Sequence, residues 1–471
     1  MQTSSTQITT QNKAFEQIAK KIDTIIKTNM VWENEVSLSG AAGTGKTYLT
    51  TKLVKKLDEF FHITITAPTH KALQVLRANL LTEGIENVDT KTIQSFLNIK
   101  LVTDYDKGIQ KFEPIKSKDK DDTKTDLLIV DESSMVSSDI YAYIIQAIEK
   151  LRVKAVLYVG DEFQLLPVDN QHNKVFEISH KYKLDKIVRQ AQGSYIINMA
   201  TKARNIIKSK QYISIKEFFS DESFKNKVQF INSKQEFYDD FCTPDTWAKN
   251  DKVIASFRNN SVDQHNKAIR KRYWQEQGIS TPQILQKGDK VIFQQANVID
   301  SMVVHQNSDI VEIASTIKIF EKKLKVEFWD CKDLAGRPFK VIDPNSKGRF
   351  ETILSKIAKE AKQEKDYGLR TQKWKIFYAI KEMFIDVKYI FASTIHKLQG
   401  STYETVYIDL TEIENMRDKD MMFRLLYVAI TRASKDVKVL LPDNKNTLLS
   451  EYQDNVLNSI DEQFSMLGLD L

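Results

Sequence analysis

GAAGTGKT, residues 40–47, is the stretch that decides the fold of this chain. It matches the pattern GxxxxGK[ST] at every fixed position, follows a short strand candidate at residues 35–39, and precedes leucines four residues apart at Leu49, Leu53 and Leu57. A strand, a glycine-rich turn and a helix in this order are the setting in which the pattern binds phosphate. The glycines let backbone N–H groups approach phosphate oxygens, and the helix N-terminus adds partial positive charge. The stretch therefore predicts a P-loop within an α/β fold.

The P-loop side chains have separate expected roles. Lys46 should reach the β- and γ-phosphates of ATP, and Thr47 should hold Mg²⁺. The alternative is a glycine-rich turn with no ligand, and it is disfavoured because the whole motif occurs in the right setting. The residues expected to bind ATP here are Gly40, Gly43, Thr44, Gly45, Lys46 and Thr47.

Apolar runs elsewhere support the same fold class. Residues 127–130 and 155–159 are apolar on both faces, which suits a buried parallel sheet, and residues 63–66 are β-branched. Their alternation with amphipathic stretches indicates an α/β core. A second block of this kind starts near residues 253–256 and resumes near residues 389–392.

Polar side chains follow two of these runs. Asp131 beside a P-loop can hold Mg²⁺, and Glu132 can orient or deprotonate an attacking water. Alone, the pair is equally compatible with an acidic helix N-cap. In the next segment, GDEFQ at residues 160–164, Gln164 could contact both water and the γ-phosphate, although glycine and aspartate are also common in turns. The order of P-loop, acidic pair and glutamine favours nucleotide hydrolysis.

The composition is that of an ordinary globular protein. The chain has 471 residues with 69 basic and 63 acidic side chains, a formal net charge of +6, which permits a polyanionic partner without requiring one. Its length suggests two to four domains. The two cysteines, Cys242 and Cys331, form no CxxC pair, which favours a reducing compartment and no zinc site. The sequence shows no membrane-spanning run and no signal peptide, so we expect a cytoplasmic protein.

Several segments occur in a fixed order, and together they resemble the motifs of superfamily 1 helicases, in particular the RecD-like branch, SF1B. The specificity lies in their joint occurrence over nearly the whole chain. The segments are residues 8–15, 40–47, 67–72, 131–132, 160–164, 184–190, 392–401 and 426–433.

The resemblance implies an α/β fold with two RecA-like P-loop domains, 1A and 2A, a small β-hairpin insertion, 1B, and an SH3-like insertion, 2B, with a charged helical extension. In that extension, Trp374, Phe377 and Phe384 are spaced for one helix face, so we expect core packing and not a stacking platform. The expected boundaries are 1–96 and 126–248 for 1A, 97–125 for 1B, 249–286 and 387–471 for 2A, and 287–386 for 2B.

The resemblance also implies roles at the nucleotide. Gln11 would contact adenine, Arg189 and Arg432 would contact the γ-phosphate, and Gln164 would sense it. Two guanidiniums would neutralise charge that spreads over the transferred phosphoryl oxygens. A surface salt bridge is the commoner fate of a single arginine, and the motif context argues against it here. The catalytic set is Lys46, Asp131, Glu132, Gln164, Arg189 and Arg432.

A further group of residues resembles the DNA-facing positions of these helicases. Hydroxyl and backbone N–H groups at strand ends can contact phosphates without reading sequence. Phe112 in the hairpin could stack on the last base pair as a wedge, or pack locally to hold the hairpin, and the sequence favours neither. The nucleic-acid set is Pro68, Thr69, His70, Phe112, Thr394 and His396.

The activity implied is ATP- and Mg²⁺-dependent translocation from 5′ to 3′ on single-stranded DNA with unwinding of duplex DNA, in phage replication or recombination. The expected partners are single-stranded DNA, duplex junctions and a single-strand-binding protein, with no membrane and a monomeric chain in the bacterial host cytoplasm. A P-loop ATPase that remodels proteins or acts as a switch leaves Arg432 and residues 392–401 unexplained. A nucleic-acid-binding protein with an idle ATP site is disfavoured because the catalytic set is complete. No residue decides between DNA and RNA.

Overall fold

The computed structural model divides into two compact units. The first unit has the bounds Met1–Ser194 and Ile279–Ile390, and the second Tyr195–Gly278 and Phe391–Leu471. The described ranges are 7–8, 11–28, 33–104, 109–115, 123–167, 173–185, 194–243, 251–299 and 302–441.

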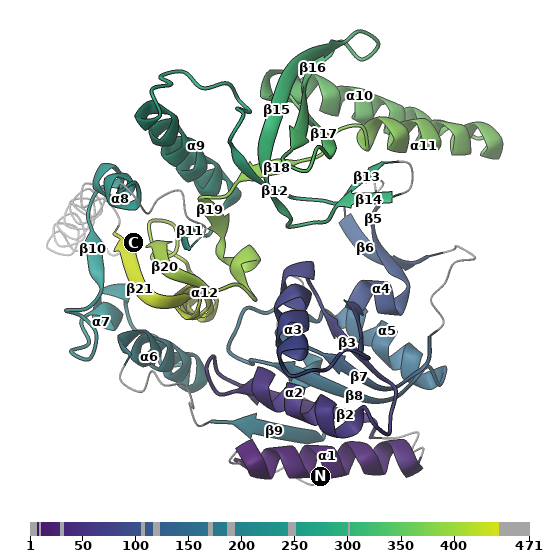
Figure 1. Ribbon diagram of the computed structural model, residues 1–471, viewed down its shortest axis with the longest axis vertical. Helices are drawn as coiled ribbons and strands as arrows, with labels where there is room; N and C mark the ends of the chain where they lie inside the picture. Colours follow the sequence, from purple (N-terminus) through teal and green to yellow (C-terminus); the bar gives the residue numbers. More distant parts are fainter. Residues whose placement is uncertain are drawn as a thin grey trace, which may run out of the picture. The chain divides into compact units, whose positions relative to one another are not determined.

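The first unit contains a parallel sheet of seven strands (Figure 1), and the P-loop follows one of its inner strands, β2. We call this sheet and its helices the first lobe. The strand order is β1-β9-β2-β8-β7-β3-β4, and every pairing is parallel. The bounds are β1 Gln7–Ile8, β2 Glu35–Gly40, β3 Ile63–Ala67, β4 Asp89–Thr92, β7 Thr125–Val130, β8 Val153–Gly160 and β9 His180–Leu184.

Helices cover both faces of this sheet, and the period of two along each strand explains how. Leu127 and Ile129 pack into one core cluster with three of the helices, while Leu128 and Val130 pack into the other cluster with two. Strands that are apolar on both faces are therefore required in this three-layered lobe. On the first face lie α1 Gln11–Thr28, α2 Lys46–Leu57 and α3 His70–Thr82, and on the second α4 Ile93–Leu97 and α5 Ser138–Glu149.

The expected hairpin insertion is present in the first unit. β5 (Ile99–Asp104) and β6 (Ile109–Pro114) pair antiparallel, with Leu101 opposite Phe112. The insertion leaves the lobe directly after α4, where Asn98 takes a left-handed backbone conformation with φ of 54°.

The second unit, which we call the second lobe, has a parallel sheet of five strands in the order β10-β21-β20-β11-β19. Its helices α8 and α9 share a core cluster with β11 and β20, and α6 packs against α12 and β21. The bounds are β10 Gln229–Ile231, β11 Lys252–Ser256, β19 Ala392–Thr394, β20 Tyr403–Asp409, β21 Ala433–Leu440, α6 Tyr195–Ser209, α7 Ile215–Phe219, α8 Lys234–Phe241, α9 Asn259–Glu276 and α12 Lys419–Thr431.

Two of the expected boundaries between lobes are wrong. Residues 195–248 were assigned to domain 1A. In the structure β10 pairs with β21 of the second lobe, and the first of the two segments that make up the first unit ends at Ser194. Residues 387–389 were assigned to domain 2A, but they form β18, which pairs with β12 of the inserted module. Both errors have one cause, since a short apolar segment does not reveal which distant strand it will pair with.

The insertion between the halves of the second lobe is an antiparallel five-stranded sheet in the order β17-β16-β15-β12-β18, which we call the SH3-like module. Its core contains Val291, Phe293, Trp329, Cys331 and Phe339. The bounds are β12 Lys290–Phe293, β15 Ile310–Glu321, β16 Val326–Asp333, β17 Pro338–Ile342 and β18 Val387–Tyr389, with a separate hairpin of β13 Asn297–Ile299 and β14 Met302–His305.

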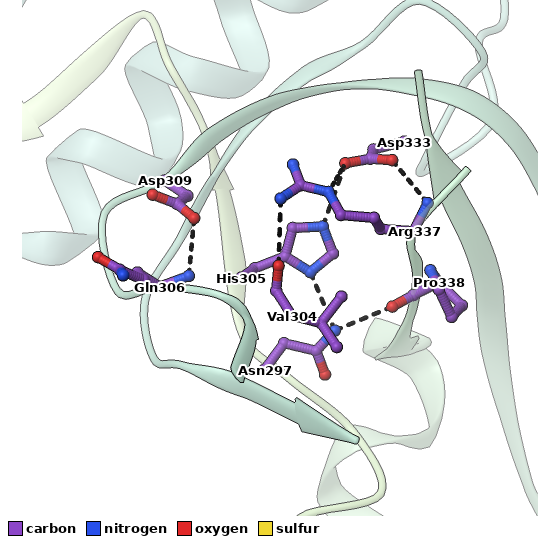
Figure 2. Close-up of polar contacts among 8 residues, drawn as sticks. All are labelled: Asn297, Val304, His305, Gln306, Asp309, Asp333, Arg337 and Pro338. Carbon is purple, nitrogen blue, oxygen red and sulfur yellow. Dashed lines mark hydrogen bonds and ion pairs between the residues drawn. The ribbon is translucent and has the colours of Figure 1, made fainter. Parts of the chain in front are cut away.

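A buried polar network fastens this separate hairpin to the module (Figure 2). His305 Nε2 lies 3.3 Å from Asp333, whose carboxylate also accepts hydrogen bonds from the backbone N–H and the Nε of Arg337. The other ring nitrogen of His305 lies 3.0 Å from the amide of Asn297, and the ring stacks on Phe293 at 4.3 Å. Burial lowers the pKa of His305, so the neutral imidazole suits this site.

Two helices extend the SH3-like module, and they run side by side in Figure 1. They are α10 (Pro344–Gln363) and α11 (Tyr367–Lys381), and we call residues 344–381 the helical arm. As expected, the aromatic residues form core: Phe377 is buried beside Trp374, and Phe384 packs against Phe350 at 5.2 Å. Among the described residues, no helix is both long and apolar enough to cross a membrane.

Candidate ATPase and nucleic-acid site

The P-loop lies where β2 ends and α2 begins. Gly43 and Gly45 have φ of 80° and 84°, a left-handed conformation that side chains disfavour. The Thr44 hydroxyl donates to the Ala41 carbonyl at 2.8 Å, which holds the turn. Lys46 Nζ donates to the carbonyls of Gly40 and Ala41 at 2.5 and 3.1 Å, so its ammonium is folded over the loop. This geometry is that of a phosphate-binding nest with its lysine in place.

Gln11 contacts the P-loop directly. Its side-chain amide donates to the Thr44 carbonyl at 2.7 Å. A Cβ added at Gly45 would lie 2.0 Å from the Gln11 Nε2, the end of a flexible side chain that can shift, so the glycine is needed chiefly for its backbone angle, with φ of 84°. Whatever contact Gln11 makes with adenine, its amide ties the start of α1 to the loop.

The acidic pair sits on the same edge of the sheet, because parallel strands place their carboxyl ends together. Asp131 is half-buried and directly follows β7, where its backbone N–H donates to the Thr66 carbonyl at 2.8 Å. Burial and the neighbouring Glu132 carboxylate raise the pKa of Asp131 well above its ordinary value, against the opposing effect of Lys46. Glu132 itself has a left-handed backbone conformation with φ of 50°.

The third polar segment also reaches this edge, after β8. Gln164 is buried, its backbone N–H donates to the Asp161 carbonyl, and its side-chain oxygen lies 3.5 Å from the Ser134 hydroxyl. The Asn173 amide donates to the carbonyls of Ser133 and Ser134 at 3.0 Å and steadies the turn after Glu132. Asn173 was not expected from the sequence, because its link to residues 133 and 134 exists in the folded chain alone.

The residues at this edge fit Mg²⁺ and a nucleotide triphosphate. Hard cations prefer carboxylate and hydroxyl oxygens, which Asp131 and Thr47 supply. Desolvation and the Glu132 carboxylate outweigh the effect of Lys46 on the pKa of Asp131, and a divalent cation at this edge would supply further positive charge that favours the ionised carboxylate. The Ser133 hydroxyl is also buried with no hydrogen-bond partner among the described residues, which leaves a polar atom available at the site.

In the second lobe, Arg432 ends α12 at the amino ends of β20 and β21. Its guanidinium is buried and donates to the carbonyls of Val428 and Ser401, both at 3.2 Å, and to the Thr431 hydroxyl at 3.1 Å. These three hydrogen bonds to neutral groups orient the guanidinium. An oriented positive charge is what an arginine finger requires.

Thr394 is the last residue of β19, and His396 follows two residues later. The Thr394 hydroxyl accepts from the Lys397 N–H at 3.4 Å and caps a 3₁₀ turn, η3 Ile395–Leu398. Burial lowers the pKa of His396, whose ring lies 6.2 Å from that of Phe257. Thr394 thus has the structural role of a cap in addition to any contact with DNA.

The same segment holds two polar groups that the sequence did not single out. The Gln399 Nε2 and the Ser401 hydroxyl are buried without hydrogen-bond partners among the described residues. Unpaired buried polar groups are costly, and each one calls for an explanation such as a catalytic role or a bound water or ion. Both residues lie within residues 392–401, the segment that resembles a helicase motif, but the sequence assigned no role to either side chain.

Residues of the nucleic-acid set in the first lobe lie after β3, on the P-loop edge. Thr69 caps α3, its side chain accepting from the Ala72 N–H at 3.2 Å. Pro68, Thr69 and His70 are all partly exposed, and burial lowers the pKa of His70. A neutral imidazole at this position can donate to a phosphate through one nitrogen.

Of the two remaining expected site residues, the structure describes Phe112 but not Arg189. The Phe112 ring is half-buried and packs against the core cluster beneath α5, while the Tyr143 hydroxyl donates to the Phe112 carbonyl at 3.2 Å. Local packing is therefore observed, and the wedge role stays a prediction. Arg189 lies outside the described residues.

Comparison with known proteins gives three family models in chain order. An AAA domain matches residues 16–210, the Dda helicase SH3 domain matches residues 255–389, and the UvrD-like helicase C-terminal domain matches residues 389–440. The match to the Dda SH3 domain covers the module that divides the second lobe in this structure. Together these matches support an SF1B helicase related to Dda.

Relatives of this Dda-related helicase are distant in sequence but similar in extent. The ATP-dependent DNA helicase dda of Enterobacteria phage T4 is 26% identical over 442 residues, covering 86% of this chain and 94% of that protein. The uncharacterised protein R530 of Acanthamoeba polyphaga mimivirus is 26% identical, with 84% and 93% covered. A solved structure of Pif1 helicase from Bacteroides, in complex with ADP-AlF3 and ssDNA, is 18% identical, covers 93% of this chain and 97% of its own, and has a TM-score of 0.49.

Proposed function

We propose that this Dda-related helicase hydrolyses ATP to move from 5′ to 3′ along single-stranded DNA and to open duplex DNA ahead of it. The observation that carries the proposal is the set of groups on one edge of the first-lobe sheet: a P-loop with Lys46 folded over it, the half-buried Asp131 and the buried Gln164. Phosphoryl transfer depends on positioning and charge stabilisation, which such a set provides.

Within this proposal each residue has a task. The P-loop N–H groups and Lys46 hold the phosphates, and Thr47 and Asp131 hold Mg²⁺, which when bound neutralises charge on the phosphate oxygens. Glu132 orients or deprotonates the attacking water, and Gln164 contacts both this water and the γ-phosphate. Arg432 supplies positive charge from the second lobe, and Arg189 is proposed for the same task.

Single-stranded DNA is proposed to contact Pro68, Thr69 and His70 of the first lobe and, separately, Thr394 and His396 of the second. These groups suit phosphate contacts, which position a strand without reading its sequence. Direction of travel depends on which lobe holds DNA at each step, so the 5′–3′ assignment rests on the relationship to Dda. A role in phage replication or recombination, a single-strand-binding protein as partner, and a monomeric state in the host cytoplasm belong to the same proposal.

Duplexes with a single-stranded tail at the 5′ end or the 3′ end test the proposal directly. We expect ATP-dependent unwinding of the 5′-tailed duplex, and Lys46→Ala serves as the inactive control. Preferential opening of the 3′-tailed duplex would refute the polarity while sparing the helicase assignment. ATPase rates with and without single-stranded DNA separate the remaining alternatives: a protein remodeller shows no stimulation, and an idle site shows no turnover.

A further inference from the structure

The helical arm carries the net positive charge of the whole chain. Residues 344–381 contain ten lysines and arginines and four carboxylates, a net of +6, which equals the formal net charge of all 471 residues. The remainder of the chain is therefore balanced. Charge concentrated on one element is a feature that bulk composition conceals.

Within the arm, the charge is ordered along α10. Its buried or half-buried side presents Phe350, Ile353, Leu354, Ile357 and Ala358 to the module and to α11. At 3.6 residues per turn, the opposite, exposed side is a continuous stripe without a carboxylate. This basic stripe consists of Arg349, Thr352, Ser355, Lys356, Lys359, Lys362 and Gln363, all exposed.

The carboxylates of the arm lie outside the stripe, and two of them have structural partners. Glu364 forms an ion pair with Lys373 at 2.8 Å, which lowers the pKa of Glu364, and Asp366 caps α11 by accepting from the Leu369 N–H at 2.8 Å. Glu351 and Glu360 flank the stripe at its two margins. Both of these carboxylates are exposed, so negative charge borders the stripe without interrupting it.

The second helix provides an internal comparison. The side of α11 opposite the buried Phe377 has Thr371, Gln372, Ile376 and Ala379 with one basic residue, Lys375; two further exposed basic residues, Arg370 and Lys381, lie near the ends of the helix and off this side. Both helices belong to the same arm and both have a water-facing side, so exposure alone does not demand the basic stripe of α10.

We propose that the basic stripe of α10 is a docking surface for the phosphate backbone of duplex nucleic acid. This inference rests on the proposed helicase function, because it gives a second contact to the duplex that the motor opens. From Arg349 to Lys362 the stripe runs about 20 Å along a straight helix. Duplex DNA presents one negative charge per ~1.7 Å of its axis, so a stripe of this length meets several phosphates whatever the sequence.

Duplex is favoured over single-stranded nucleic acid because the stripe contains lysine, arginine and hydroxyl groups and no aromatic side chain. Proteins bind single strands by stacking bases on aromatic rings, whereas phosphate contacts come from basic and hydroxyl side chains. The stripe can contact phosphates but has nothing on which a base would stack.

The test uses the full chain and measures binding of a blunt duplex of about 20 base pairs by fluorescence anisotropy over a range of KCl concentrations. The stripe variant is Lys356→Gln, Lys359→Gln and Lys362→Gln, because glutamine retains helix propensity. The matched control also removes three positive charges from the SH3-like module, at three exposed lysines of the β15–β16 turn: Lys322→Gln, Lys323→Gln and Lys325→Gln.

We expect the stripe variant to bind duplex about tenfold more weakly near 0.1 M salt, with the slope of log affinity against log salt reduced by up to ~3, since each phosphate contact contributes ~0.9. The control should change affinity less than about twofold. An opposite variant, Thr352→Lys with Ser355→Lys, should tighten binding. Duplex affinity within about twofold of wild type in the stripe variant, or an equal loss in the control, would overturn the proposal.

ATPase stimulation by oligo-dT keeps this proposal distinct from the helicase assignment. The stripe variant should retain the stimulation of the wild type, because none of its three lysines is placed at the nucleotide or on the single strand. Loss of stimulation in the stripe variant alone would mean that the arm serves the single-strand site, which would also overturn a duplex-specific surface. If oligo-dT did not stimulate the wild-type ATPase, the helicase proposal would be refuted. The duplex-binding measurement would still test the basic stripe.

Discussion

Replacing Arg432 separates the chemical role of this guanidinium from its structural one. In Arg432→Ala, the hydrogen bonds to Val428, Ser401 and Thr431 are lost, and the two carbonyls are left as buried acceptors. A hydrogen bond contributes about 1 kcal/mol net, so we expect the second lobe to lose roughly 2–3 kcal/mol of stability. An arginine finger accounts for about 10³–10⁵ in rate, or roughly 4–7 kcal/mol of transition-state stabilisation. The catalytic effect should therefore exceed the structural one.

The assay combines kcat for ATP at saturating single-stranded DNA, equilibrium binding of a fluorescent ATP analogue, and urea unfolding. We expect kcat to fall by at least about 10³ while nucleotide affinity changes little, because the finger acts on charge that develops in the transition state. Arg432→Lys keeps a positive charge without the forked geometry and should recover stability more than rate.

A matched control lies on the same helix. Arg424 is largely buried and forms an ion pair with Asp420 at 2.6 Å. Arg424→Ala should lower the stability of the second lobe while leaving kcat within a few-fold of wild type. If Arg432→Ala lost stability but kept kcat within about tenfold, Arg432 would be a helix cap and the finger assignment would be refuted. If only KM for ATP rose, it would be a ground-state binding residue.

Three further predictions concern other parts of the molecule. Lys46→Ala should abolish ATP hydrolysis while filter binding to single-stranded DNA persists, and turnover near wild type would reject the P-loop assignment. Phe112→Ala should slow unwinding several-fold while DNA-stimulated ATPase persists, with Tyr143→Phe as the control that loosens the hairpin and keeps the ring; a parallel fall in both activities would assign Phe112 to packing alone. Acidification from about pH 7.5 to pH 5 should lower the unfolding midpoint of the full chain, because the pKa of His305 is depressed in the folded state and its stabilising effect, present above the ordinary value of 6.5, is lost as pH falls. His305→Asn should show a smaller drop over this interval, and an equal drop would contradict the assignment.

Local sequence was sufficient to predict the fold class and the nucleotide edge. Residues 40–47 combine a strand, left-handed glycines and a helix start, and such short-range signals do not depend on distant partners. The runs ending at Val130 and Gly160 are apolar on both faces, so they had to lie in a buried parallel sheet. Parallel strands place their carboxyl ends together, and from this Asp131 and Gln164 could be expected beside Lys46.

Partners that are distant in sequence were decided by the tertiary structure alone. β10 was assigned to the wrong lobe because the sequence of a three-residue strand does not indicate that it will pair with β21. The ties from Gln11 to Thr44 and from Asn173 to Ser133 likewise exist only between segments that folding brings together. Phe112 could be a wedge or a packing residue in the sequence, and folding supplied the core cluster against which its ring lies. Sequence thus determined the chemistry that each short segment can perform, whereas long-range packing determined which segments share a lobe and which polar atoms remain unpaired for a ligand.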